Sequence, residues 1–129
     1  MSDIRVDTIS AANGTDPVTL TKQSAAKAWV NFNSSTTVRD SVNVASLTDV
    51  GTGSTTVNYT NNLANTNYCT HYTTDGVHNG SAASLGHGDS DNSTLIGTSY
   101  VKVQCRGAEG NGGTFDAVVQ CVSIHGDLA

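Results

Sequence analysis

The chain has 129 residues and a net charge of −5, and Thr, Ser, Asn and Gly make up 57 of those residues. This length corresponds to one domain, and the six scattered Lys and Arg residues argue against a nucleic-acid-binding surface. The chain contains no run of about 18 apolar residues that could cross a membrane, and MSDIRVDTIS lacks the basic and apolar regions of a secretory signal.

The composition favours strands over helices. Val (14) and Thr (18) far outnumber Leu (6), and β-branched side chains fit a pleated, half-buried surface. Leu, Ile, Val and Phe together number only 26, which indicates a small core for this length. Because a small core often leaves a domain dependent on partner chains, we expect a homo-oligomer.

Residues 1–26 differ from the rest of the chain. Ile4 and Val6 alternate with charged residues, turn signals follow at Asn13-Gly14 and Asp16-Pro17, and TKQSAAKA offers nothing to bury. We expect an N-terminal arm over 1–26 that attaches the protein or wraps a trimer. Its candidate attachment residues are Ile4, Val6, Ile9, Val18 and Leu20.

Strand-like patterns begin at Lys27. In AKAWVNFN, Ala28 and Val30 share one face of the predicted strand. Trp29 and Phe32 lie on opposite faces of it. One of these two aromatic residues should therefore face another sheet or another chain. Next, Val42, Val44 and Ser46 alternate in a single predicted strand, and the GTG at 51–53 is typical of a tight hairpin.

Four further strand patterns complete the predicted fold. Three of them alternate along one face: Thr55, Val57 and Tyr59; Tyr68, Thr70 and Tyr72; and Val101, Val103 and Cys105. The last, FDAVVQCVSIHG, is apolar on both faces (Ala117, Val119 and Cys121; Val118, Val122 and Ile124), as expected of a central strand, with GAEGNGG before it as a hairpin loop. Short strands at this spacing predict an all-β fold, an antiparallel β-sandwich over 27–129.

Residues 74–98 interrupt this pattern with five Gly and almost no periodicity. Structureless loops of more than about 12–15 residues are usually functional or disordered, and adaptable polar side chains on a strand scaffold are typical of recognition. We expect this loop to carry partner specificity, with a passive spacer as the alternative. The candidate contact residues are His78, Asn79, Ser81, His87, Asp89, Asp91 and Asn92.

Metal-binding and catalytic patterns are weak. His71, His78, His87 and His125, with Asp75, Asp89 and Asp91, suggest a metal site, but Gly-rich loops rarely hold ligands in a fixed geometry. The Asp-rich stretch 88–93 lacks the Glu of a calcium loop, and no GxSxG motif or facing pair of acids is present. We therefore predict no enzyme, no cofactor and no metal, and keep a hydrolase as an alternative to be tested.

The aromatic and cysteine residues leave alternatives open. Trp29, Tyr59, Tyr68, Tyr72 and Tyr100 offer faces for stacking on sugars, although strand tyrosines more often pack against neighbouring strands. Cys69, Cys105 and Cys121 are odd in number and form no CxxC motif, which favours free buried thiols over a disulfide framework. One disulfide with a leftover thiol stays open.

Three long segments carry a family resemblance: AAKAWVNFN, VRDSVNVASLTDVGTGSTTVNYTNNLANTNYC and SYVKVQCRGAEGNGGTFDAVVQCVSIHGD. They resemble the small fibre-type virion proteins of tailed bacteriophages, especially those of marine hosts, and IRVDTISAANGTDPVTL is similar to a lead segment of phage tail proteins. The resemblance spans positions 2–73 and 98–127. The chain departs from it at His125, where a Phe is expected before Gly126-Asp127, and across 74–98.

The resemblance implies a non-enzymatic structural protein of the virion, trimeric, with a β-sandwich tip. We expect a tail-fibre component involved in host attachment, with a capsid decoration or head-fibre protein as the alternative. The expected location is thus the virion, on the tail or on the capsid surface. Expected partners are other copies of the chain, other virion proteins and a host-surface glycan or protein, without nucleic acid or membrane insertion.

Overall fold

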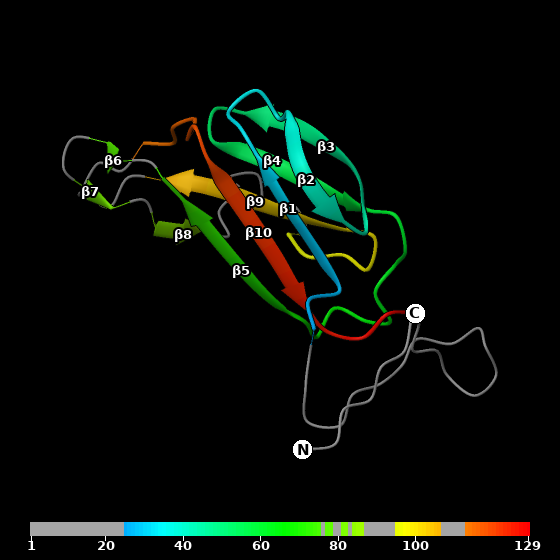
Figure 1. Ribbon diagram of the computed structural model, residues 1–129. Helices are drawn as coiled ribbons and strands as arrows, with labels where there is room; N and C mark the ends of the chain where they lie inside the picture. Colours follow the sequence, from blue (N-terminus) through cyan, green and yellow to red (C-terminus); the bar gives the residue numbers. More distant parts are fainter. Residues whose placement is uncertain (1–24, 76, 79–80, 83, 87–94, 107–112) are drawn as a thin grey trace, which may run out of the picture.

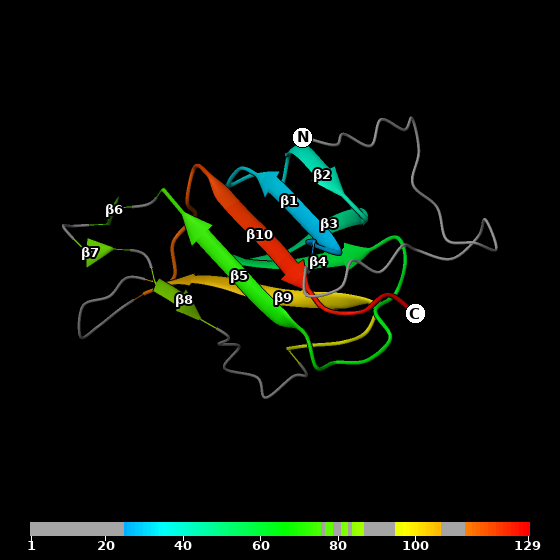
Figure 2. The ribbon, with the colours of Figure 1, turned by 60° about the horizontal axis from the view of Figure 1, so that its bottom comes forward.

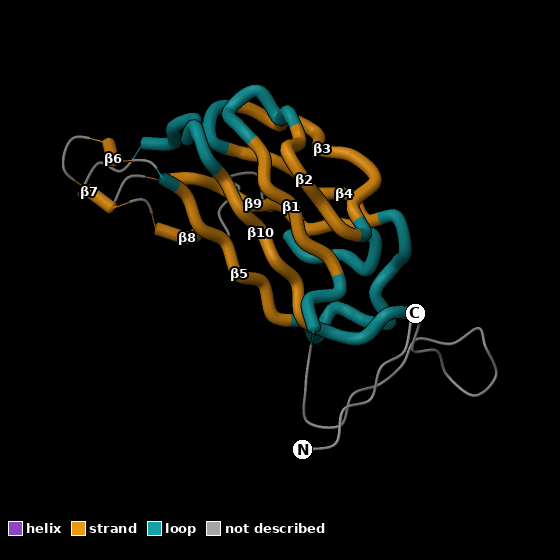
Figure 3. Tube along the Cα trace, viewed as in Figure 1, coloured by secondary structure: helices purple, strands orange, loops and turns teal. Residues whose placement is uncertain are grey.

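The computed structural model describes residues 25–75, 77–78, 81–82, 84–86, 95–106 and 113–129. The described part is all-β, with two antiparallel sheets packed face to face (Figures 1 and 2). Figure 3 shows strands and connecting loops and no helix in this part of the chain. The predicted antiparallel β-sandwich is confirmed.

The first sheet, sheet A, has the strand order β2-β1-β10-β5. Its strands are β1 (Ala28–Phe32), β2 (Val38–Val42), β5 (Cys69–Thr74) and β10 (Gln120–His125). β1 and β2 are joined by a short turn, whereas β10 pairs with β1 and β5, both far away in the sequence. The prediction of a central last strand is confirmed, because β10 has a neighbour on each side.

The second sheet, sheet B, has the order β3-β4-β9-β8. Its strands are β3 (Val44–Gly51), β4 (Ser54–Tyr59), β8 (Ser84–Gly86) and β9 (Tyr100–Arg106). The predicted hairpin joins β3 to β4 through Gly51 and Gly53, both at positive φ. Gly53 is needed there, because a Cβ would lie 2.6 Å from the Phe115 carbonyl oxygen and 2.7 Å from that of Cys105.

The core lies between the sheets and is made by alternate residues of five strands. Sheet A contributes Ala28, Val30, Phe32, Tyr72, Val122 and Ile124, and sheet B contributes Val57, Tyr59, Val101, Val103 and Cys105. The inward faces predicted from alternation are confirmed for β1, β4 and β9. For the start of the last predicted strand, the expectation of apolar residues on both faces is wrong, because Val118 is 63% exposed and the polar Gln120 takes the inward position.

The strand predicted through Val42, Val44 and Ser46 is interrupted at Asn43. There the chain leaves sheet A and enters sheet B, and Asn43 has a φ of 56°. Its Nδ2 donates to the carbonyl oxygens of Lys27 (3.0 Å) and Asn61 (3.1 Å), and its Oδ1 accepts from the Asn61 amide (2.7 Å). Asn tolerates the left-handed region, and these bonds tie the corner to two other chain segments.

Two predicted connections are also corrected. The segment 74–98 contains strands: β6 (Val77–His78) pairs with β7 (Ser81–Ala82), and β8 pairs with β9. The predicted hairpin loop is closed by an antiparallel bridge between Arg106 and Thr114, but it does not pair β9 with β10, because β9 lies in sheet B and β10 in sheet A. β6 and β7 pair locally, whereas β8 has its partner, β9, about 20 positions later in the chain.

Candidate binding groove on sheet A

A groove of about 350 Å³ runs over the outer face of sheet A, the face turned away from sheet B. Register places its side chains in two rows across β1, β10 and β5, the neighbouring strands seen face-on in Figure 1. The first row is Trp29, Ser123 and His71, and the second row is Asn31, Cys121 and Thr73. Small side chains on the central strand, between a tryptophan and a histidine, make this face concave.

Trp29 and Asn31 form the β1 side of the groove. Both point outward, since Ala28, Val30 and Phe32 alternate with them into the core. The Asn31 side chain is fixed at both ends: its Nδ2 donates to the Cys121 sulfur (3.2 Å), and its Oδ1 accepts from Arg39 (3.2 Å). Arg39 also donates to the Val118 carbonyl oxygen (3.1 Å), which holds the guanidinium at the rim.

His71 forms the opposite side and belongs to a small cluster at the groove's end. Its ring lies edge-to-face on that of His125, with centroids 5.4 Å apart, and its Nε2 lies 3.5 Å from the Cys69 sulfur. Within the described ranges no group of three or more His, Cys, Asp or Glu residues has the arrangement to hold a metal ion. Of His71, His125 and Cys69, only His71 lines the groove.

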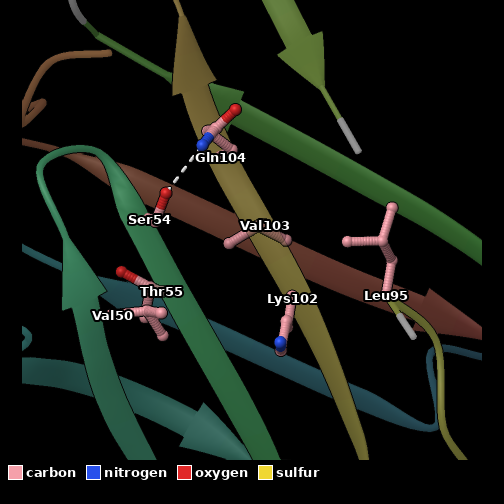
Figure 4. A pocket seen from close by; sticks show the side chains of 7 residues that line it. All are labelled: Val50, Ser54, Thr55, Leu95, Lys102, Val103 and Gln104. Carbon is pink, nitrogen blue, oxygen red and sulfur yellow. Dashed lines mark hydrogen bonds between the residues drawn. The ribbon is translucent and has the colours of Figure 1, made fainter. Parts of the chain in front are cut away.

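A second hollow lies on the outer face of sheet B, lined by residues of β3, β4, β9 and the segment before β9 (Figure 4). Gln104 and Ser54 reach toward each other across β9 and β4, and the Gln104 Nε2 donates to the Ser54 hydroxyl at 2.8 Å. The hollow has a volume of about 10 Å³, which is close to the space of one water molecule. It is too small for an organic ligand.

The tyrosines proposed for sugar stacking are mainly part of the packing. Tyr59 is 5% exposed and Tyr72 is 3% exposed, and burial raises the pKa of both phenols. The Tyr72 hydroxyl donates to the Gln120 Oε1 at 2.6 Å, inside the core. Tyr68 packs edge-to-face on Tyr59, and its hydroxyl lies 3.0 Å from the Gly97 carbonyl oxygen, although desolvation still raises its pKa. The expectation that strand tyrosines pack against neighbouring strands is thus confirmed for Tyr59 and Tyr72. Trp29, in contrast, lies on an outer face, where its ring is not part of the core.

The candidate residues from the sequence are placed only in part. His78 and Ser81 are paired across β6 and β7. The other residues of the proposed contact loop (Asn79, His87, Asp89, Asp91 and Asn92) and all five arm residues (Ile4, Val6, Ile9, Val18 and Leu20) lie outside the described residues.

All three cysteines are free thiols, as the sequence favoured, but only Cys105 is buried. Burial raises the pKa of its thiol. Cys69 is exposed and Cys121 is half-buried, both on the outer face of sheet A. The prediction of buried thiols is therefore correct for one of the three.

The groove as a whole was not predicted. The alternation in the sequence did place Trp29 and Asn31 on the face opposite to Ala28 and Val30, and this was the part of the groove that the sequence could indicate. Their neighbours on β10 and β5 are about 40 to 90 positions away, so only the pairing register brings them together.

No protein-family model, no curated protein and no solved structure matches the chain. In the described part of the chain, no helix has the length and apolar character needed to cross a membrane. Function is therefore inferred from the residues of the chain and from the faces of its two sheets.

Proposed function

We propose that this chain is a non-enzymatic structural protein of a tailed-bacteriophage virion, a tail-fibre component that takes part in host attachment. One observation carries the proposal: the segments that resemble fibre-type virion proteins supply the central strands of both sheets, β1 and β10 in sheet A and β4 and β9 in sheet B. AAKAWVNFN contains β1, the long second segment contains β2, β3 and β4, and the third contains β9 and β10. Of the described strands, the part without resemblance, 74–98, supplies only the last residue of β5, the β6–β7 pair and the edge strand β8.

Assembly as a homotrimer is part of the proposal. The edge strands β2 and β3 are mostly exposed on both faces, and they carry three half-exposed valines, Val38, Val42 and Val50. A free strand edge with apolar side chains is a surface that proteins usually cover. A second copy of the chain is the occupant we expect. Mass photometry of the full chain tests this, and a stable folded monomer at nanomolar concentration would contradict it.

Labelling of particles tests the location. Virions of the phage that encodes the chain are treated with gold-labelled antibodies raised against the purified protein and viewed by electron microscopy. Gold on the tail supports the proposal, whereas gold spread over the capsid supports a decoration or head-fibre protein instead. Virions lacking the protein would contradict both functions.

Two deletions test the division of roles along the chain. Removal of 1–26 is expected to abolish incorporation into virions while the sandwich stays soluble, because residues from Ala28 onward already form a core cluster between the two sheets. Replacement of 76–96 by a short Gly-Ser turn is expected to reduce adsorption to host cells. Incorporation without the arm would place attachment elsewhere, and undiminished adsorption would make 76–96 a spacer.

A further inference from the structure

We propose that the groove on sheet A binds a neutral saccharide, stacked on Trp29 and hydrogen-bonded by the side chains of β10 and β5. The inference deepens the proposed function and rests on it for its biological meaning, since such a groove would give an attachment protein a contact with host-surface glycans. The binding itself is a property of the purified chain and can be tested without virions.

The dimensions of the groove suit one or two sugar units. β1 and β5 are two strand spacings apart, so its walls are about 10 Å from each other, and its two rows are about 7 Å apart along β10. The floor consists of Cys121 and Ser123, which are too small to fill this space. A volume of about 350 Å³ falls at the lower end of ligand sites, which range from about 300 to 1,000 Å³.

The lining combines an aromatic face with polar groups on the opposite side. The Trp29 indole is the largest apolar surface of the groove, and the face of a pyranose ring, with its C–H groups, can lie against it. Ser123, Thr73 and His71 offer hydroxyl and imidazole groups, which donate to and accept from sugar hydroxyls. The exposed lining is mostly apolar, as suits the C–H face of a sugar ring, and the few polar groups can orient its hydroxyls.

The charges near the groove favour a neutral ligand. The lining residues carry no Lys, Arg, Asp or Glu. At the rim, Arg39 is held by Asn31 and by the Val118 carbonyl oxygen, and Asp40 lies beside Asn31 in the register of β1 and β2. A carboxylate or sulfate on the sugar would meet Asp40 as well as Arg39, two opposite charges at the same rim, so these neighbours offer it no net attraction. Anionic glycans are therefore expected to bind more weakly than neutral ones.

Trp29 is the only tryptophan of the chain, so its fluorescence reports directly on the groove. The full-length protein is titrated with neutral disaccharides (lactose, maltose, cellobiose and mannobiose) and, for comparison, with sialyllactose and digalacturonic acid. We expect a saturable change in Trp29 emission with at least one neutral disaccharide, and at least tenfold weaker binding of the acidic ones. No response to any neutral sugar, or a response to acidic sugars alone, would overturn the proposal.

Two variants and a matched control locate the site. Ser123→Arg fills the groove floor but keeps Trp29, and it is expected to abolish the fluorescence response. Trp29→Ala is expected to weaken binding, measured by calorimetry, at least tenfold. Thr56→Ala, which truncates a half-buried side chain on the outer face of sheet B, is expected to leave binding unchanged. Circular dichroism checks the folding of each variant.

Binding that survives in folded Ser123→Arg would place the sugar elsewhere and overturn the proposal. Mass photometry of Trp29→Ala adds a separate outcome. If this variant dissociates the oligomer, the groove is a contact between copies and the saccharide proposal is wrong. The virion-labelling result is independent of all these outcomes, so failure of saccharide binding is distinguishable from failure of the proposed virion role.

Discussion

Replacement of Tyr72 by Phe tests how much the buried polar pair between β5 and β10 contributes to stability. Tyr72 is 3% exposed and Gln120 is 2% exposed, and the Tyr72 hydroxyl donates to the Gln120 Oε1 at 2.6 Å. The Gln120 Nε2 donates in turn to the Ala117 carbonyl oxygen at 3.3 Å. Water cannot easily reach this pair, so each group depends on its partner.

The expected magnitude follows from the group left behind. Tyr72→Phe removes one hydroxyl, opens no large cavity and leaves the buried Gln120 Oε1 unsatisfied, which typically costs about 1–3 kcal/mol. For a domain of this size that is a fall in Tm of roughly 4 °C per kcal/mol. Gln120→Met is expected to cost a similar amount, because it leaves the Tyr72 hydroxyl with only the weak Cys105 thiol as a partner and removes the donor to the Ala117 carbonyl oxygen.

The assay is urea unfolding of both single variants and the double variant, followed by Trp29 fluorescence and by circular dichroism. Because the double variant removes both partners, its loss of stability should be smaller than the sum of the two single losses by about 1 kcal/mol or more. Losses that add to within about 0.5 kcal/mol would refute the reasoning, since they would mean that the two side chains are not coupled.

Three further predictions concern the hairpin, the thiols and alkaline pH. Gly53→Ala should reduce the free energy of unfolding by about 1–3 kcal/mol more than Gly51→Ala in urea titrations, because both glycines have positive φ but only at Gly53 does a Cβ meet backbone atoms; equal losses would contradict this. An aromatic disulfide reagent should label exposed Cys69 in the folded protein, whereas Cys105, buried and with a raised pKa, should react only on unfolding. Mass spectrometry of the labelled peptides shows which cysteine has reacted, and labelling of Cys105 in the folded protein would contradict the prediction. Burial raises the pKa of Tyr72 above its usual value of 10.0, so the unfolded state releases this proton first and stability should fall as the pH rises above about 10. This alkaline fall should be shallower in Tyr72→Phe, and an identical pH profile would show that Tyr72 does not contribute.

The sequence by itself determined the fold class and the inward faces of the strands. Alternation put Val57 and Tyr59 on one face of β4, and Val101, Val103 and Cys105 on one face of β9, and all five residues are in the core. These predictions depend on neighbouring residues alone, because side chains of a strand alternate with a period of two. The Gly-rich hairpin at 51–53 was predictable for the same reason, since turn chemistry is local.

The tertiary structure decided which strands pair and therefore where a binding face can form. Alternation continues through Val42 and Val44, but the chain changes sheets at Asn43, whose side chain bonds to segments near Lys27 and Asn61. The row of Trp29, Ser123 and His71 exists only because β10 inserts between β1 and β5. Such pairings join residues far apart in the sequence and are selected by burial of the whole core, so no local pattern contains them.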